Sequence, residues 1–489
     1  MKEMDNLTIE TTLSSLNEKK FSSLELTNYF INRIETNKNL NCYITCTFDI
    51  ARQMANRVDN KIKNSEALGI LEGVPIAMKD LFCTKNVRTT AGSRILENFI
   101  PFYESTVSNN LWKSGAIMLG KSNLDEFAMG SANTTSNFGN VINPWKSEKN
   151  SSLSLVPGGS SGGSASAVSS DLCIAATGSD TGGSIRQPAA FCGLVGLKPT
   201  YGRCSRFGMI AFASSLDQAG PITKTVTDSA IMLQAMSSYD DKDSTSSKRD
   251  IPNFCANIKD GIEGKKIGIP KEYNVKGLNG EIDKIWKNGI KFLCDEGAEV
   301  IEISLPHTEY ALPAYYIIAP AEASANLARY DGIRYGQRED ANEIDELYKS
   351  TRFKGFGSEV RRRIMIGTYV LSAGYYDAYY LKALKIRRLI SNDFKNSFKK
   401  CDFILTPTTP GVAFPIGEKQ SDPLEMYLND VLTVPASLAG LPAISVPSGL
   451  SSDKLPIGLQ LISKPFDEVT LLKAAYVLEQ KVNFNRLKI

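Results

Sequence analysis

The chain contains two glycine-serine runs, Pro157-Gly-Gly-Ser-Ser-Gly-Gly-Ser-Ala165 and Asp180-Thr-Gly-Gly-Ser-Ile-Arg186. Apolar segments flank both of them, with Ala165-Ser-Ala-Val168 after the first and Leu172-Cys-Ile-Ala-Ala176 before the second, which is unlike a flexible linker. Glycine-rich turns let the backbone approach a ligand closely and point several N–H groups into one space. The charged ends of the second run are expected to hold its shape as an ion pair. From their spacing alone, the runs are consistent with serine catalysis, phosphate binding or structural turns.

A catalytic interpretation makes Ser184 the nucleophile, with the N–H groups of its own turn stabilising a tetrahedral oxyanion. A serine hydroxyl needs a base, and the chain has a single histidine, His307, in a polar context. The alternative base is Lys79, at the end of the apolar run Val74-Pro-Ile-Ala-Met-Lys79. Burial lowers the pKa of a lysine and favours its neutral form. Ser160, in the first run, would then relay the proton from Ser184 to Lys79.

A rival motif, Gly115-Ala-Ile-Met-Leu-Gly-Lys-Ser122, matches the phosphate-loop pattern GxxxxGK[ST]. A phosphate loop places a flexible turn between its two glycines, but Ala116–Leu119 resembles a strand. No apolar period typical of a helix begins at Lys121. We therefore expect a strand here and no nucleotide site.

Short strand-like runs alternate along the chain with stretches of helical apolar spacing. The predicted strands are Val74–Met78, Ala116–Leu119, Leu172–Ala176, Lys266–Ile269, Glu299–Ile303, Phe403–Leu405, Ala443–Val446 and Ile457–Ile462. The predicted helices are 163–170, 280–295, 357–400 and 467–482. This alternation favours an α/β fold with a mixed, twisted β-sheet core covered by helices on both faces. We expect one large domain over 1–489, with an N-terminal helical region at about 1–65 and a polar loop or seam near 238–250.

Composition narrows the class of protein. The net charge of +3 over 489 residues implies no extensive nucleic-acid-binding surface. The nine cysteines form no CxxC pair, which is typical of thiols in a reducing compartment, and the single histidine disfavours a zinc site. The N-terminus lacks a signal-peptide pattern, and no apolar run approaches the roughly 20 residues of a membrane span. We expect a cytoplasmic protein without a metal site or a membrane segment.

Three separated elements resemble the amidase signature family. They are Lys79, the run Pro157–Ser164 and the run Gly178-Ser-Asp-Thr-Gly-Gly-Ser-Ile-Arg-Gln-Pro188, in the family's order and spacing. The resemblance implies a single amidase-signature domain with a Ser–cis-Ser–Lys triad. In that triad Ser184 is the acyl-enzyme nucleophile, Ser160 the bridging cis-serine and Lys79 the base. The backbone of Thr181, Gly182, Gly183 and Ser184 would form the oxyanion hole.

Later segments are similar to the A subunits of amidotransferases that act on glutamyl-tRNA(Gln) or aspartyl-tRNA(Asn). These segments are Gly73–Leu81, Asn123–Ser131, Ala319–Gly332, Gly374–Tyr380 and Leu441–Pro447. The resemblance implies that the chain hydrolyses glutamine and passes ammonia to a B subunit, which uses ATP and Mg²⁺ and contacts most of the misacylated tRNA. A small C subunit would complete a heterotrimer, and this chain would need no cofactor of its own. The sequence leaves open whether tRNA(Gln), tRNA(Asn) or both are served.

The same resemblance places four residues in a glutamine pocket. Arg363 would bind the α-carboxylate and Asp430 the α-amino group, while Tyr315 and Met129 would line the site. Arg362 is the alternative to Arg363, because three arginines are adjacent. Two features depart from the family pattern: Ser437 stands where asparagine is usual, and Ser147–Leu155 reads as an insertion. The competing functions are a stand-alone amidase with the same triad and a nucleotide-binding protein that uses Gly115–Ser122.

Overall fold

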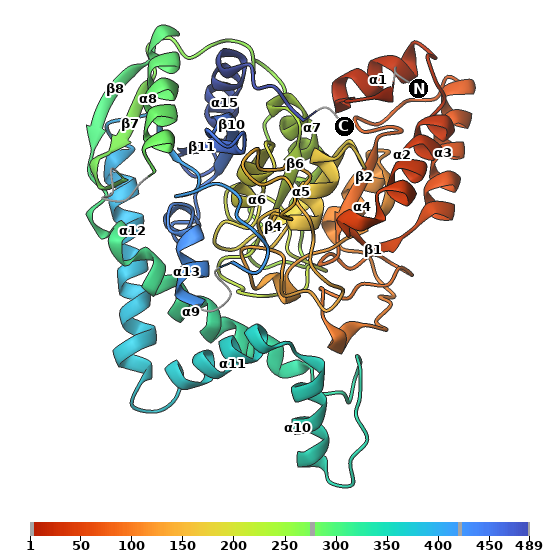
Figure 1. Cartoon of the computed structure of the whole chain (residues 1–489), viewed down its shortest axis with the longest axis vertical. Coiled ribbons are helices and arrows are strands. Elements are labelled where there is room, and N and C mark those ends of the chain that lie inside the picture. Colours follow the sequence, from red (N-terminus) through yellow and green to blue (C-terminus); the bar gives the residue numbers. More distant parts are fainter. Residues whose placement is uncertain (1–3, 274–278, 419–422, 488–489) are drawn as a thin grey trace.

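A single β-sheet runs through the computed structural model, which describes residues 4–273, 279–418 and 423–487 (Figure 1). The strands are β1 (Tyr43–Cys46), β2 (Pro75–Lys79), β3 (Ile117–Ser122), β4 (Ala175–Asp180), β5 (Val195–Lys198), β6 (Gln218–Thr223), β7 (Lys266–Pro270), β8 (Glu299–Ile303), β9 (Phe403–Pro407), β10 (Ala443–Leu450) and β11 (Pro456–Ser463). Their spatial order is β1-β3-β2-β4-β6-β5-β10-β11-β9-β7-β8. The β2–β3, β2–β4, β7–β8 and β7–β9 pairs are parallel and the other pairs antiparallel, so the predicted mixed sheet is confirmed.

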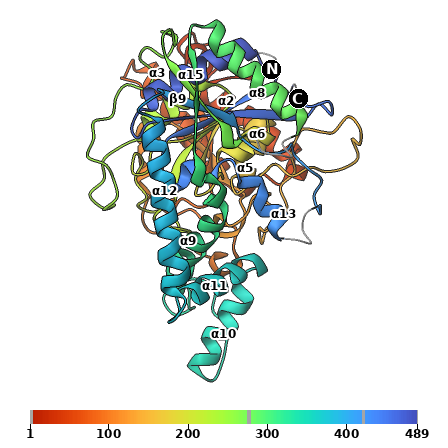
Figure 2. The same ribbon diagram turned by 90° about the vertical axis from the view of Figure 1, so that its left-hand side faces the viewer.

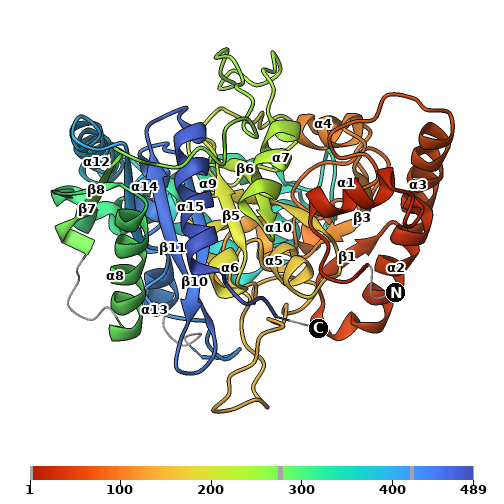
Figure 3. The ribbon, with the colours of Figure 1, turned by 90° about the horizontal axis from the view of Figure 1, so that it is seen from above.

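Helices cover both faces of this sheet. They are α1 (Ile9–Asn17), α2 (Ser23–Thr36), α3 (Phe48–Lys63), α4 (Thr106–Lys113), α5 (Gly162–Ser169), α6 (Arg186–Phe191), α7 (Val226–Met236), α8 (Gly280–Asp295), α9 (Ala311–Asn326), α10 (Ile344–Gly355), α11 (Ser358–Val370), α12 (Lys382–Ser397), α13 (Pro423–Tyr427), α14 (Val434–Leu438) and α15 (Glu468–Val482). Gly458 of β11 packs on Ala190 of α6, whereas its neighbour Leu459 packs on Gly289 of α8. Successive residues of a strand point to opposite faces, so α6 and α8 lie on opposite sides of β11 (Figure 3). The predicted fold class is confirmed.

Local sequence explains the better-predicted helices. In α2, the Ser22 side chain accepts from the Glu25 N–H and the Glu25 side chain accepts from the Ser22 N–H, which forms a capping box. Leu26, Phe30 and Ile34 follow at helical spacing and are buried. A different group, α9 to α12, extends away from the sheet, and α10 lies at the far end in two perpendicular views (Figures 1 and 2).

Three sequence predictions need correction. The N-terminal helical region also contains β1, which pairs with the buried strand β3, and this partner is distant in sequence. The strand predicted at Leu172–Ala176 is displaced, because β4 continues through buried polar residues to Asp180. The helix predicted over 357–400 is interrupted after α11, where Gly374 has φ +88°, and the chain is π-helical over Tyr376–Leu381 before α12 begins.

The polar stretch at 238–250 is a loop between α7 and β7, and two of its aspartates anchor it to the body. Asp240 accepts a hydrogen bond from Ser205 Oγ at 2.6 Å, and Asp243 accepts one from the Arg206 N–H at 2.8 Å. Among the described residues, no helix is both long and apolar enough to cross a lipid bilayer.

Candidate active site

Parallel strands bring the first site residues together, because Lys79 ends β2 and Asp180 ends the neighbouring β4. The Lys79 N–H donates to Thr177 Oγ1 at 2.9 Å, which ties the two strands at this point. The Lys79 Nζ lies 2.8 Å from each of three hydroxyls, those of Ser160, Ser161 and Ser179. The side chain is fully buried, and this burial lowers the pKa of Lys79 to about 7. Lys79 therefore has a substantial neutral fraction near neutral pH.

Ser160 sits in the first glycine-serine run, immediately before α5. The Gly159–Ser160 peptide bond is cis, which is the geometry that the family resemblance implies for this serine. The Gly159 N–H donates to Gln187 Oε1 at 2.9 Å, and the Asp125 N–H donates to the Ser160 carbonyl at 3.2 Å. Hydrogen bonds from both sides thus fix the run that presents Ser160 to Lys79.

Ser184 lies in the second run, between β4 and α6. The two runs meet directly, because the Ser161 N–H donates to the Ser184 carbonyl at 3.2 Å. Ser184 is 8% exposed, whereas Lys79 and Ser160 are fully buried, so the predicted nucleophile is the most exposed of the three. Within the described residues, the Ser184 hydroxyl has no hydrogen-bond partner. Its hydroxyl can therefore turn toward a substrate, but the Ser184–Ser160 hydrogen bond that the predicted proton relay needs is not formed among the described residues.

The turn before Ser184 offers donors for an oxyanion. In the part of the chain that the structure describes, the N–H groups of Gly182, Gly183 and Ser184 donate to no protein atom. A Cβ on Gly182 would lie 2.9 Å from the Tyr315 ring, and one on Gly183 would lie 2.2 Å from Thr433 Oγ1. Both positions therefore require glycine, and the turn is packed tightly enough to hold its N–H groups in place.

Two buried aspartates hold the ends of this turn. Thr181 Oγ1 donates to Asp217 Oδ1 at 2.7 Å. Asp180 forms a buried ion pair with Arg186 at 2.9 Å, as the sequence predicted, and Arg186 also donates to Ser437 Oγ at 2.8 Å. Burial raises the pKa of the Asp180 carboxyl, but Arg186 outweighs that effect and the net pKa is lowered. The serine that departs from the family pattern thus supports the ion pair and not the triad.

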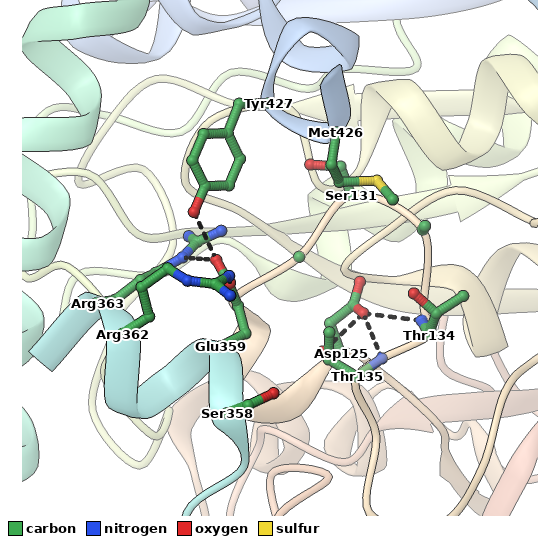
Figure 4. Close-up of a pocket in the computed structure, with 12 residues that line it drawn as sticks. Asp125, Ser131, Thr134, Thr135, Ser358, Glu359, Arg362, Arg363, Met426 and Tyr427 are labelled. Atoms are coloured by element: carbon green, nitrogen blue, oxygen red, sulfur yellow. Dashed lines mark hydrogen bonds and ion pairs between the residues drawn. The ribbon is translucent and has the colours of Figure 1, made fainter. Parts of the chain in front are cut away.

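A cavity of about 250 Å³ lies next to the first run, since a Cβ on Gly159 would be 2.1 Å from Oδ2 of the lining residue Asp125 (Figure 4). Its walls come from the loop after β3, from the start of α11 and from α13. They comprise Asp125, Gly130, Ser131, Ala132, Thr134, Thr135, Ser358, Glu359, Arg362, Arg363, Met426 and Tyr427. The Asp125 carboxylate accepts from the N–H groups of Asn133, Thr134 and Thr135, and this contact folds the loop. The Gln187 amide joins the cavity to the first run, because its Nε2 donates to the Ser131 carbonyl at 2.9 Å.

The structure distinguishes the two candidate arginines on α11. The Arg363 side chain is 3% exposed and the Arg362 side chain is 46% exposed, although both reach the cavity. The Arg363 guanidinium carbon lies 5.3 Å from the ring centre of Tyr316, 5.4 Å from that of Tyr427 and 5.6 Å from that of Phe212. A solvated helical charge would show none of these contacts. Arg363 is therefore a buried cation of the cavity wall that aromatic rings hold in place.

Asp430 connects the cavity to the nucleophile turn. Its Oδ2 accepts from Ser131 Oγ at 2.5 Å, and its Oδ1 lies 3.2 Å from the position of a Cβ on Gly183. Burial raises the pKa of Asp430 to about 7, against the opposing effects of Ser131 and Arg363. A cation bound at this carboxylate would favour its ionised form.

The remaining predicted residues lie nearby in different roles. Tyr315 is buried on α9 and packs on Gly182. Met129 is fully buried in the hydrophobic core, directly before Gly130, and does not line the cavity. Sequence reasoning missed Glu359, Tyr427 and the Ser131 hydroxyl. Of these, only Glu359 could have been found from the sequence. It precedes Arg363 by four residues, a spacing that predicts a side-chain ion pair on a helix.

Two other sequence features take structural places. Lys121 and Ser122 of the phosphate-loop pattern end the buried strand β3, and Lys121 forms an ion pair with Asp80 at 3.2 Å. The pattern is therefore a strand, as predicted. His307 lies in a 3₁₀ turn with its ring one-third exposed, and its Nδ1 is 2.9 Å from Asp393 Oδ2.

The chain is similar over nearly its whole length to known proteins. A family model described as Amidase matches residues 25–472. The A subunit of the glutamyl-tRNA(Gln) amidotransferase of Parvibaculum lavamentivorans is 59% identical, over 99% of this chain and 98% of that protein. The crystal structure of the protein of the same name from Thermotoga maritima is 41% identical with a TM-score of 0.80, and the match covers 98% of this chain and 96% of that one. A native peptide amidase from Stenotrophomonas maltophilia is 29% identical with a TM-score of 0.84, over 99% and 98% of the two chains.

Proposed function

The chain belongs to the amidase family, and from this premise we propose that it is the glutamine-hydrolysing A subunit of a tRNA-dependent amidotransferase. It would convert glutamine to glutamate and ammonia. A partner subunit would use the ammonia to convert misacylated Glu-tRNA(Gln), or Asp-tRNA(Asn), to the correctly aminoacylated product. The observation that carries the chemistry is the buried contact of 2.8 Å between Lys79 Nζ and Ser160 Oγ, next to the turn that holds Ser184. Relatives of 57–59% identity, each named as the A subunit of a glutamyl-tRNA(Gln) amidotransferase, support the substrate.

Acylation would start from neutral Lys79. A neutral amine has two N–H bonds and one lone pair, so among the three surrounding hydroxyls it can donate to two and accept from the third. We assign the accepting contact to Ser160, which passes on the proton of Ser184 as Ser184 Oγ attacks the γ-carboxamide carbon. The negative charge that develops on the amide oxygen would be stabilised by the N–H groups of the turn Thr181–Ser184.

The same residues would complete the reaction in reverse roles. Protonated Lys79 returns its proton through Ser160 to the leaving nitrogen. The C–N bond then breaks, ammonia departs, and a γ-glutamyl ester remains on Ser184. A water molecule then attacks this ester, its proton follows the same route to Lys79, and glutamate is released as Ser184 Oγ regains a proton.

Substrate recognition would use two charges, Arg363 in the cavity wall and Asp430 behind it, which accepts from the wall residue Ser131. Arg363 has the geometry to bind the α-carboxylate, and Asp430 lies next to Gly183, where the α-amino group of a substrate bound at Ser184 would reach it. The ammonium group would keep Asp430 ionised, although burial alone raises its pKa to about 7. An amide without these two charges would gain nothing from either residue.

The proposal includes partners outside this chain. A B subunit would bind the misacylated tRNA and activate it with ATP and Mg²⁺, and a C subunit would complete the heterotrimer. This chain would contribute no cofactor or metal of its own, and the complex would work in the cytoplasm, where the aminoacylated tRNAs are made and used.

The test is to purify the chain alone and together with its B and C subunits, and to measure glutamine hydrolysis and Glu-tRNA(Gln) amidation in each preparation. We expect glutamine-dependent amidation only in the complex. Rapid turnover of unrelated amides by the lone chain, with no stimulation by the partners, would instead identify a stand-alone amidase.

A further inference from the structure

Glu359, in the first turn of α11, is the acceptor for three side chains at the cavity wall (Figure 4). Its Oε1 accepts from Arg363 Nε at 2.8 Å and from the Tyr427 hydroxyl at 2.9 Å. Its Oε2 accepts from Arg362 Nη1. One carboxylate therefore joins α11 to α13 and touches both arginines.

The contact with Arg363 uses one edge of the guanidinium and leaves the other edge available. Only Nε of Arg363 has a hydrogen-bond partner within the described residues, and the guanidinium packs against the rings of Tyr316 and Tyr427. These two rings also stack on each other, with centres 3.9 Å apart. Because Nε is held and the rings limit rotation, the two terminal nitrogens remain for a ligand that fills the cavity. A carboxylate matches such a pair of N–H groups in bidentate geometry.

We propose that Glu359 is a positioning residue for substrate specificity: by holding Arg363 Nε and the Tyr427 hydroxyl, it sets the terminal nitrogens of Arg363 to bind the α-carboxylate of glutamine. This inference rests on the proposed function and explains how that function selects an α-amino acid. Arg362 reaches the same carboxylate from the exposed side and, within the described residues, lies against no aromatic ring. Glu359 thus orients Arg363, and not Arg362, to bind the substrate carboxylate.

The charge of Glu359 makes the inference easy to test. If Glu359 positions Arg363, removing its charge should raise KM for glutamine, whereas if it only repels the substrate carboxylate, removing its charge should lower KM. Burial raises the pKa of Glu359, but the neighbouring Arg363 and the hydrogen bonds that it accepts bring the net pKa below its usual value. The group is therefore ionised at neutral pH and repels a substrate carboxylate through space. Removing only that repulsion would improve glutamine binding, whereas releasing Arg363 would weaken it.

The experiment measures kcat and KM for glutamine in the complete heterotrimer carrying wild-type chain, Glu359→Gln or Glu359→Ala. We expect KM to rise by about tenfold in Glu359→Ala, with kcat within about twofold, because ground-state binding is lost while the triad is intact. Glu359→Gln retains one acceptor oxygen and should give an intermediate KM. Glutaminamide, in which the α-carboxyl is a neutral amide, should show no change in KM.

Controls separate this inference from the function and from misfolding. Glu339→Gln removes an acidic partner of Lys354 outside the cavity, and it should leave both constants unchanged. A fall of KM for glutamine in both Glu359 variants, or an equal change for glutaminamide, would overturn the positioning role. Absence of glutamine hydrolysis by the wild-type complex would instead contradict the proposed function itself.

Discussion

Lys79 and Lys121 lie on neighbouring strands but point to opposite faces of the sheet, and their surroundings differ in kind. They belong to the neighbouring parallel strands β2 and β3, where Met78 is paired with Lys121, and both side chains are fully buried. Lys121 Nζ contacts the Asp80 carboxylate at 3.2 Å and donates to the Phe82 carbonyl and Thr89 Oγ1 at 2.7 Å. Lys79 Nζ contacts three serine hydroxyls and, among the described residues, no carboxylate.

This difference separates the proposed base, Lys79, from a lysine held in an ion pair, Lys121. Burial lowers the pKa of both lysines, but at Lys121 a carboxylate in direct contact opposes the shift. The carboxylates that act on Lys79, led by Asp125, are not in contact with it and leave its pKa at about 7. Burial lowers the pKa of a lysine, and the groups in contact with its Nζ decide whether it can exchange a proton during the reaction.

The most severe test of this comparison replaces Lys79. We expect Lys79→Ala to reduce kcat for glutamine by at least about 10³-fold, because Ser184 loses its base. The variant should remain folded, and mass spectrometry of the complex after mixing with glutamine should detect no acyl-enzyme. A variant that still acylates at the wild-type rate would show that another group takes the proton of Ser184.

The corresponding change at Lys121 should affect folding more than chemistry. Lys121→Met leaves the Asp80 carboxylate buried without its cation, and we expect the free energy of unfolding to fall by about 3–5 kcal/mol. Lys79→Met should cost less, since only neutral hydroxyls lose a partner. Urea unfolding followed by circular dichroism compares the two, and equal losses would remove the distinction drawn from their contacts.

The three hydroxyls around Lys79 sharpen the comparison further. Ser160, Ser161 and Ser179 lie at the same distance from Nζ, but only Ser160 is assigned the relay to Ser184. We expect Ser160→Ala to reduce kcat by about 10²–10³-fold, the usual contribution of proton transfer, and Ser179→Ala to have a smaller effect. Steady-state kinetics on matched preparations gives both numbers. Full activity of Ser160→Ala would mean that the relay is assigned to the wrong serine.

Arg362 and Arg363 are a second pair of like side chains with different surroundings, one exposed and one buried at the cavity. Arg363→Ala should raise KM for glutamine by about 10²-fold, because a bidentate contact to a carboxylate is lost in a buried site. Arg362→Ala should change KM by less than about threefold, as is usual for an exposed charge. Glutamine titrations of each variant complex test this, and the reverse order would make Arg362 the carboxylate ligand.

The smallest effect is the pH dependence of the wild-type enzyme. Lys79 must be neutral to act, and its pKa of about 7 means that kcat at saturating glutamine should fall about tenfold per unit below that pH. Asp430, also with a pKa of about 7, becomes protonated on the same side and should raise KM there. Initial rates measured between about pH 5.5 and 9 test both the fall of kcat and the rise of KM. A kcat that does not change over this range would show that Lys79 is already neutral or is not the base.

Local signals in the sequence were sufficient for part of the fold. The strand Glu299–Ile303 and the helix Gly280–Asp295 coincide with their predictions, because the strand is rich in β-branched residues and the helix has a regular apolar spacing. The strands β5 and β6 were missed, since they contain glycine, lysine or proline inside the sheet and are stabilised by neighbours far along the chain. The buried Thr177, Ser179 and Asp180 likewise hid the end of β4.

The sequence by itself determined the class of fold and the candidate reactive groups. Ser160 and Ser184 stand in glycine-rich runs with apolar flanks, and Lys79 ends an apolar run; all three are local properties of the sequence. Only the tertiary structure decided that Lys79 contacts hydroxyls while Lys121 contacts a carboxylate, and that Glu359 holds Arg363 rather than solvent. These differences depend on which distant segments meet, and identical side chains acquire different charges and partners only when that packing is complete.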